Sequence, residues 1–266
     1  MSRFHTCCAL SLVGGFLLAA PTAQAQSGAA AIKKVADSYA ALNTYEGTSS
    51  LDARIVSKGK PLQSAANTIS LKFKQPNKIN LQVSTNRGSL NIVSDGKDLI
   101  IYDARSNAYI KVPAPADGKK LLQEIAGRAG VSAFMDPLFF LTKFPIPSAL
   151  SSFAVKGNET YNGHPVTVIT GVEKSPKGQI RNWKWWVDKQ TNLLRKIEGT
   201  TQPQPLKVTR TEGKKKIPMT IQVSQLTRHI IAELKPNPNL SDGVFHFAIP
   251  PNATLKKSVN ELMKGK

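Results

Sequence analysis

The residues that could carry out catalysis are few and widely spaced. After the predicted leader, the histidines are His164, His229 and His246, and none has a second ligand at a short metal-binding spacing. Glu159 and Glu173 are carboxylates of the kind that hydrolyse glycosidic bonds in pairs, but nothing in the sequence brings them together. The sequence also lacks a nucleophilic serine elbow, a phosphate loop and a dinucleotide fingerprint. We therefore expect no enzyme, no catalytic residue, no metal and no cofactor.

The remaining acidic side chains fit structural roles. Asp95, Asp98 and Asp103 gather near one predicted hairpin, where aspartate is favoured because its side chain bonds to the turn backbone. Asp188 stands at the end of a predicted strand.

The first residues are typical of a secretory leader. Arg3 precedes an apolar run, residues 9–20, and Ala23-Gln24-Ala25 is a small-x-small cleavage site. The run is shorter than the roughly 20 apolar residues of a membrane span. We expect cleavage after Ala25 and a periplasmic mature protein.

The chain is strongly basic, with a formal net charge of +19, and removal of Arg3 leaves 19 − 1 = +18. Such a charge favours acidic partners: anionic lipid, envelope polysaccharide or nucleic acid. The compact basic cluster is Gly213–Lys216, a predicted hairpin tip, and no nucleic-acid-binding motif accompanies it, so we expect no nucleic acid partner. Cys7 and Cys8 lie in the leader, so we expect no disulfide in the mature chain.

Hydrophobic periodicity predicts a helix followed by strands. Helical spacing predicts one amphipathic helix over about residues 29–43, with Ser27 as its N-terminal cap. Six short β-prone stretches follow, separated by turn residues that include Asp95-Gly96. Their ranges are 50–57, 67–75, 78–85, 89–94, 98–103 and 107–113. Apolar and polar residues alternate in them, which indicates an antiparallel sheet with one covered face.

A helical insert then interrupts the strands. Asp117 can cap a helix over residues 118–130, and Asp136 with Pro137 can begin a short helix over residues 137–144. Strands resume after Pro147 and continue toward the C-terminus. In the strand "NWKWWVD", alternation places Trp183 and Trp185 on one face, which we expect to be the covered one.

This order of elements resembles the LolA/LolB-like superfamily of periplasmic lipoprotein carriers. The stretches that carry the resemblance are the leading helix, "FKQPNKINLQV", "VSDGKDLIIYDARSNAYIKVPAP", "WKWWVDKQTNLLRKIE" and "VFHFAIPPNATLKK". The resemblance implies an α+β fold: an unclosed antiparallel β half-barrel with an N-terminal helix and a helical lid on its concave face. The predicted organisation is a signal peptide (1–25), a half-barrel domain (26–258) with a lid insert (117–147), and a polar tail (259–266).

The resemblance also implies a hydrophobic space between sheet and lid that takes acyl chains. The residues expected to line it are Leu71, Phe73, Leu81, Val83, Leu121, Leu122, Ile125, Phe134, Leu138, Phe139, Phe140, Leu141, Phe144, Trp183 and Trp185. Apolar stripes are also what an ordinary packed core requires, so a filled interior stays open as the alternative.

Two functions follow from these alternatives. The first is a non-catalytic periplasmic protein that binds or carries a lipid or the acyl chain of a lipidated protein, with an anionic membrane surface as a further partner. The second is an envelope interaction protein with a fully packed half-barrel, which would bind acidic polysaccharide or a protein through its basic surface. The state of the interior distinguishes them.

Overall fold

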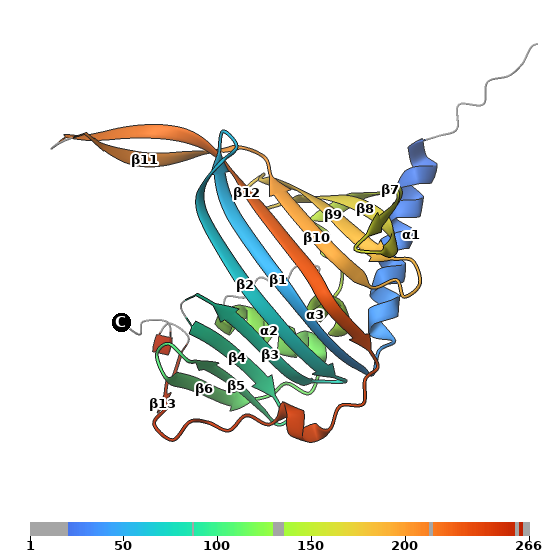
Figure 1. Ribbon diagram of the computed structural model, residues 1–266, viewed down its shortest axis with the longest axis vertical. Coiled ribbons are helices and arrows are strands. Elements are labelled where there is room, and N and C mark those ends of the chain that lie inside the picture. Colours follow the sequence, from blue (N-terminus) through green and yellow to red (C-terminus); the bar gives the residue numbers. More distant parts are fainter. Residues whose placement is uncertain (1–20, 87, 130–135, 213–214, 259–260, 263–266) are drawn as a thin grey trace, which may run out of the picture.

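The computed structural model describes residues 21–86, 88–129, 136–212, 215–258 and 261–262. Thirteen strands of this part form one twisted sheet (Figure 1). The strands are β1 (Thr44–Ser57), β2 (Lys60–Lys74), β3 (Lys78–Thr85), β4 (Gly88–Ser94), β5 (Asp98–Asp103), β6 (Ala108–Pro113), β7 (Leu150–Tyr161), β8 (His164–Lys174), β9 (Ile180–Asp188), β10 (Leu194–Thr201), β11 (Gln204–Glu212), β12 (Lys215–Pro236) and β13 (Thr254–Leu255).

The sheet is open, with β13 at one end and β7 at the other. Its order is β13-β6-β5-β4-β3-β2-β1-β12-β10-β9-β8-β7, and β11 pairs with β12 off this path. All described pairs are antiparallel except β13 with β6. The expected unclosed, mostly antiparallel sheet is thus confirmed.

Three α-helices lie on one face of the sheet, which we call the inner face. They are α1 (Pro21–Ala40), α2 (Gly118–Ala129) and α3 (Pro137–Leu141), and a 3-10 turn, η1 (Asp242–Phe245), follows β12. Helix α1 runs along β7, and α3 contacts α1, α2 and β2, with α2 and α3 lying behind the sheet in the view of Figure 1. The helices therefore cover the lower part of the sheet as it is drawn there.

One hydrophobic core joins the helices to the inner face. Register places Phe73 opposite both Tyr45 and Ile79, and all three side chains are buried. The same core contains Ile101 of β5 and Ile169 of β8, which are far apart in the strand order. A sheet whose distant strands contact one core must curve around it, so the inner face is the predicted concave face.

The leading helix differs from its predicted bounds. Within the described residues, helix α1 spans Pro21–Ala40, so Ser27 lies inside the helix and the predicted cap there is wrong. The chain then turns directly into β1 at Thr44.

The two caps predicted for the insert are confirmed. Asp117 Oδ1 accepts a hydrogen bond from Lys120 N (2.9 Å), and Asp136 Oδ1 accepts one from Phe139 N (3.0 Å). Helix α3 ends at Leu141 rather than at residue 144, because Thr142 Oγ1 bonds back to the Leu138 carbonyl and the next backbone turns to positive φ.

The strands next to the predicted breaks are longer than expected. Strand β1 starts at Thr44 instead of residue 50, and β2 starts at Lys60 instead of residue 67. The added residues of β1 pair with β12 and with residues 69–74 of β2, and the added residues of β2 pair with residues 52–57 of β1. Strands β1, β2 and β12 extend beyond the strands on either side (Figure 1).

Candidate functional site: an apolar groove on the inner face

The residues predicted to line a cavity form a packed core. Most of them are 0–7% exposed: Leu71, Phe73, Leu81, Leu121, Leu122, Ile125, Leu138, Phe139, Phe140, Leu141, Trp183 and Trp185. Val83 and Phe144 pack against the same core and are partly buried, and Phe134 lies outside the described residues. The predicted lid therefore packs directly on the sheet where its described residues meet it.

Aromatic contacts fix the lid in place. The Phe140 ring stacks on Tyr39 of α1 with centroids 5.6 Å apart, and Phe139 meets Phe140 edge to face at 5.3 Å. Phe139 also contacts Phe144 at 5.2 Å. Such pairs stabilise a core beyond the contribution of simple burial, so these rings help to hold α3 against α1.

The helices leave the inner face of the long strands partly uncovered. Cross-strand register places Ala65 of β2, Ala53 of β1 and Thr227 of β12 in one row across the sheet. Their side chains are small, and each remains at least partly accessible. Small residues in adjacent strands lower the surface locally, which makes this row the floor of a shallow groove.

A hollow of about 260 Å³ lies on this row. It is lined by Ala53, Arg54, Ile55, Gln63, Ala65, Gln225, Leu226 and Thr227. The neighbouring row of the inner face, formed by Gln63, Ile55 and Gln225, also lines the hollow. We call this feature the inner-face groove.

Trp183 closes one end of the row. Gly199 of β10 lies opposite Thr227, and Trp183 of β9 lies opposite Gly199. A Cβ on Gly199 would lie 2.7 Å from Trp183 Cζ3, so the indole ring rests directly on the glycine. From β2 to β10 the row crosses three inter-strand spacings, about 14 Å in all.

The tryptophans lie as the alternation predicted. Trp183 and Trp185 stack at 6.1 Å and belong to the inner-face core, whereas Trp186 packs in a separate cluster on the outer face with Val166 and Val168. Trp185 Nε1 is fully buried and has no hydrogen-bond acceptor among the described residues. A buried donor without a partner costs free energy, and the 0% exposure of Trp185 places this atom in the packed core and outside the groove.

One polar cluster lies beside the groove. His229 Nε2 is 2.7 Å from Ser49 Oγ, and His229 occupies the row next to Thr227. Burial lowers the pKa of His229, which the charge of Asp136 opposes in part, and burial raises the pKa of Asp136. Both shifts favour neutral side chains, so the cluster adds little charge to an apolar surface.

The possible catalytic groups are kept apart by the fold. Glu173 accepts from Trp183 Nε1 (2.9 Å) and Glu159 from Trp186 Nε1 (2.9 Å), which places these carboxylates on opposite faces of the sheet. They cannot act on one glycosidic bond. His164 Nδ1 lies 3.5 Å from Asp188 Oδ2, a carboxylate already held by an arginine.

The aspartates near the hairpin stabilise turns. Asp95 Oδ1 accepts from the backbone N–H groups of Lys97 and Asp98 (both 2.8 Å), which lowers the pKa of Asp95. Asp98 pairs with Lys111 at 2.7 Å. No group of three or more possible metal ligands was found in the described part of the chain.

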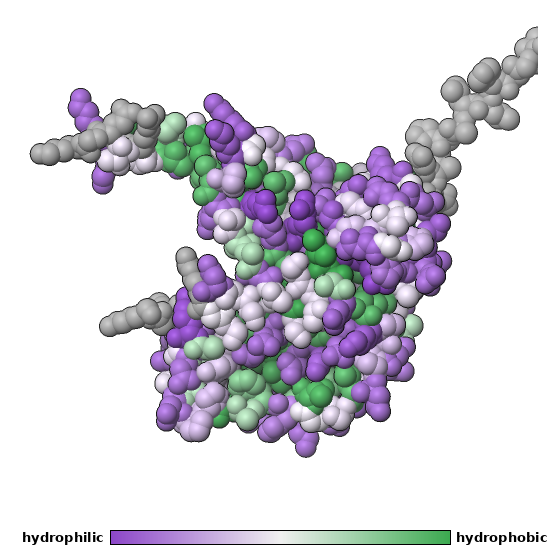
Figure 2. Space-filling view, in the orientation of Figure 1, coloured by the Kyte–Doolittle hydropathy of each residue, from purple (hydrophilic) through white to green (hydrophobic). Residues whose placement is uncertain are grey.

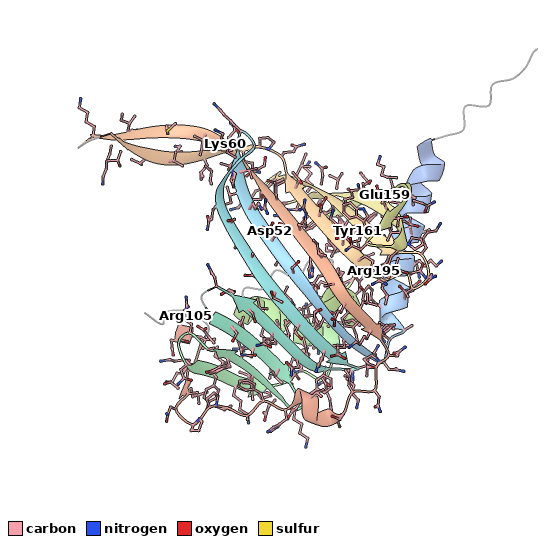
Figure 3. The ribbon with its side chains drawn as sticks, in the orientation of Figure 1. Asp52, Lys60, Arg105, Glu159, Tyr161 and Arg195 are labelled. Atoms are coloured by element: carbon pink, nitrogen blue, oxygen red, sulfur yellow. The ribbon has the colours of Figure 1, made fainter. Side chains whose placement is uncertain are left out.

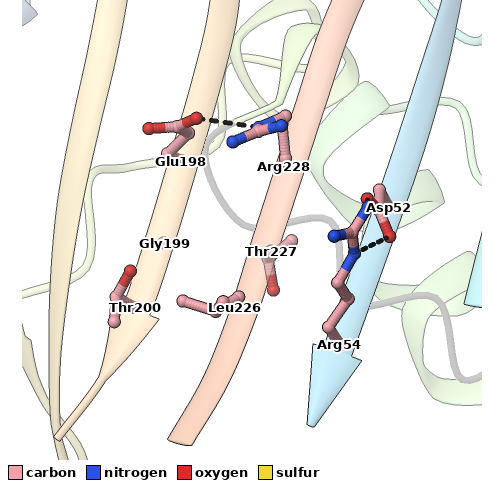
Figure 4. Close-up of a pocket in the computed structure, with 8 residues that line it drawn as sticks. All are labelled: Asp52, Arg54, Glu198, Gly199, Thr200, Leu226, Thr227 and Arg228. Carbon is pink, nitrogen blue, oxygen red and sulfur yellow. Dashed lines mark hydrogen bonds and ion pairs between the residues drawn. The ribbon is translucent and has the colours of Figure 1, made fainter. Parts of the chain in front are cut away.

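The outer face of the long strands is different in character. A smaller hollow of about 120 Å³ there is edged by ion pairs, with Glu198 bound to Arg228 (2.8 Å) and Asp52 to Arg54 (Figure 4). The charged side chains of this hollow satisfy one another. A larger hollow of about 420 Å³ also lies on the outer face, where Pro61, Ala66 and Ile230 contribute apolar surface to its lining.

Sequence patterns missed the groove because its floor residues are inconspicuous. Ala53, Ala65 and Thr227 carry no motif and stand in three strands. Their alternation with polar neighbours could have placed each on the covered face, but only the register between strands brings them into one row.

The fold and the groove together define an unclosed half-barrel with a helical cover on its concave face. Residues 28–255 match the model of a family described as predicted periplasmic protein (DUF2092), and the chain belongs to that family. Its predicted periplasmic location is thereby confirmed. The described residues contain no helix long and apolar enough to cross a membrane.

Several solved structures are similar in fold. The lipoprotein LppX of Mycobacterium tuberculosis is 12% identical, with 81% of this chain and 99% of that chain covered and a TM-score of 0.40. A putative outer membrane lipoprotein-sorting protein domain from Vibrio parahaemolyticus is 10% identical, with 84% and 97% covered and a TM-score of 0.33. A LolA superfamily protein from Nitrosomonas europaea is 11% identical, with 84% and 98% covered and a TM-score of 0.31. No curated protein matched the chain.

Proposed function

We propose that this protein is a non-catalytic periplasmic carrier that holds the acyl chain of a lipid or of a lipidated protein in the inner-face groove. The observation that carries the proposal is the row of small residues Ala65, Ala53 and Thr227, which leaves a hollow on the inner face beyond the helices. Its lining is half apolar, from Ala53, Ile55, Ala65 and Leu226, and half polar, from Arg54, Gln63, Gln225 and Thr227. The apolar half would contact the acyl chain, because burial of methylene groups drives the binding of such a ligand.

The energetics support an acyl chain as the occupant. Each buried methylene contributes about 0.8 kcal/mol, so about ten of them contribute about 8 kcal/mol before the costs of ordering. The neutral state favoured for His229 and Asp136 avoids placing a charge beside the chain.

Two neighbouring alanines provide a matched test. Ala65 and Ala66 are both exposed on β2, and alternation points Ala65 into the groove and Ala66 to the outer face. Ala65→Trp is expected to fill the groove and weaken uptake of a fluorescent fatty-acyl probe about tenfold or more, which corresponds to about 1.4 kcal/mol. Ala66→Trp is expected to leave uptake unchanged. Equal affinities of the two variants would contradict the proposal.

The close packing of the predicted lid favours a second candidate. Phe139, Phe140 and Leu141 are each 1% exposed, as expected of a filled half-barrel that acts through its surface. Such a protein would bind acidic polysaccharide or a protein partner through its basic side chains. Surface charge contacts weaken steeply with salt, whereas acyl burial does not. An absence of probe uptake, together with salt-sensitive binding to an acidic polymer, would favour this candidate.

A further inference from the structure

The hairpin of β11 and the first part of β12 extends beyond the sheet as a two-stranded ribbon. In the described chain, residues 204–212 pair with residues 215–223 and with no other strand, whereas β12 pairs with β1 from residue 224 onward. Figure 1 shows this ribbon projecting from the upper end of the long strands. We call it the arm. An isolated two-stranded hairpin is marginally stable in water, so a partner surface would stabilise it.

One face of the arm carries a row of apolar side chains. Register places Leu206 opposite Ile221 and Val208 opposite Met219, and Ile217 continues the same face of β12 opposite Arg210. Leu206, Met219 and Ile217 are 40%, 40% and 41% exposed, which makes them three of the six most exposed large apolar side chains described. Figure 2 shows hydrophobic surface on the arm and where it meets the body.

The opposite face and the base of the arm are polar and basic. Lys207, Thr209 and Thr220 are exposed and alternate with the apolar residues. Residues 204–223 contain five basic residues and one acidic residue in the sequence. Lys60, at the neighbouring turn between β1 and β2, adds a further exposed charge at the base of the arm (Figure 3).

We propose that the arm is a docking element for an anionic membrane surface, with Leu206, Ile217 and Met219 inserted at the level of the lipid headgroups and the surrounding lysines on acidic lipid. Apolar side chains flanked by basic ones are the pattern of elements that lie in the membrane interface. Lysine side chains near the surface add electrostatic attraction to anionic lipid.

The small size of the arm favours a lipid surface over a protein partner, and its edges limit how deep it can insert. A stable protein interface needs about 800 Å² on each partner, which a narrow ribbon with three part-exposed apolar side chains does not provide by itself. The edges of the ribbon also carry unpaired backbone groups, which would be costly in hydrocarbon. The arm would therefore enter only to headgroup depth, with its apolar face down.

The apolar side of the arm continues, along β12, the side of that strand that lines the inner-face groove. Ile217, Met219 and Ile221 share one face of β12 with Gln225 and Thr227, which line the groove. Docking would therefore turn the groove toward the bilayer, where an acyl chain enters or leaves. This inference builds on the proposed function, but membrane docking can be measured without any cargo.

Flotation of the full mature chain with lipid vesicles tests the arm. The vesicles are phosphatidylcholine alone or phosphatidylcholine with about one quarter phosphatidylglycerol. Met219→Glu changes the apolar face, and Thr220→Glu makes the same charge change on the opposite face of the same strand. We expect binding to anionic vesicles to fall about tenfold with Met219→Glu and far less with Thr220→Glu.

The outcomes separate this inference from the proposed function. Equal losses in the two variants, or no binding of the unaltered chain to anionic vesicles, would overturn membrane docking by the arm. Acyl-probe uptake is measured in parallel and should be unchanged in both variants, which also checks that they are folded. Vesicle binding without probe uptake would leave the arm supported and count against the carrier proposal alone.

Discussion

His229 Nε2 lies 2.7 Å from Ser49 Oγ on the inner face, one row away from the floor of the groove. This contact joins β12 to β1 at the point where the packed core gives way to accessible apolar surface. It also places the titratable side chain of His229 beside the groove, where a bound acyl chain would require that side chain to be neutral.

The first prediction concerns pH and His229. Burial lowers the pKa of this histidine, so between the folded value and the ordinary value of about 6.5 the unfolded chain binds more protons than the folded chain. The free energy of unfolding should therefore fall as pH decreases from about 7.5 to about 5.5. His229→Gln is expected to reduce this slope, measured by urea denaturation at each pH.

The carboxyl group of Asp136, which interacts electrostatically with His229, changes the free energy of unfolding with pH in the opposite direction. Burial raises the pKa of Asp136, so acidification relieves the cost of its buried charge and favours the folded state. Asp136→Asn in combination with His229→Gln is the control for this contribution. If the free energy of unfolding changes with pH equally in His229→Gln and in the unaltered chain, the pKa of His229 is not lowered in the folded protein.

The second prediction concerns Phe140. Its ring is 1% exposed and stacks on Tyr39, so Phe140→Ala is expected to lower the free energy of unfolding by about 3–5 kcal/mol. Phe144→Ala, at a partly exposed ring, is expected to cost less. Denaturant unfolding of both variants provides the measurement, and similar losses would mean that α3 is not part of the core.

The third prediction concerns Gly199. A methyl group there would lie 2.7 Å from the Trp183 ring, so Gly199→Ala is expected to displace the indole and shift tryptophan emission. Gly127→Ala meets no atom within 4 Å in α2 and should instead stabilise the protein by about 1 kcal/mol. Retention of the native emission spectrum in Gly199→Ala would refute the contact that closes the groove.

The sequence predicted the fold best where alternating apolar and polar residues are bounded by turn residues. Strands β3 and β5 have their predicted bounds, because alternating side chains are enclosed by turn residues such as Asp95-Gly96. The start of β1 was missed because Gly47 resembles a turn residue. In the structure, a Cβ at Gly47 would lie 2.5 Å from the Tyr45 hydroxyl oxygen, so this glycine accommodates a buried ring within a strand.

The candidate site was only partly accessible to sequence reasoning. Alternation placed Trp183 and Trp185 on the covered face, which is confirmed. The predicted cavity residues were those with the largest apolar side chains, and large side chains fill space instead of leaving it. The groove depends on small residues from β1, β2 and β12 that meet through register, which a single sequence does not specify.

Native mass spectrometry of the mature protein purified from its own envelope, followed by lipid extraction, tests the carrier proposal most directly. The account predicts a stoichiometric acyl-bearing species that is lost in Ala65→Trp and retained in Ala66→Trp. A clean apo mass for the unaltered chain, with no uptake of a fatty-acyl probe, would contradict it and direct attention to the basic surface.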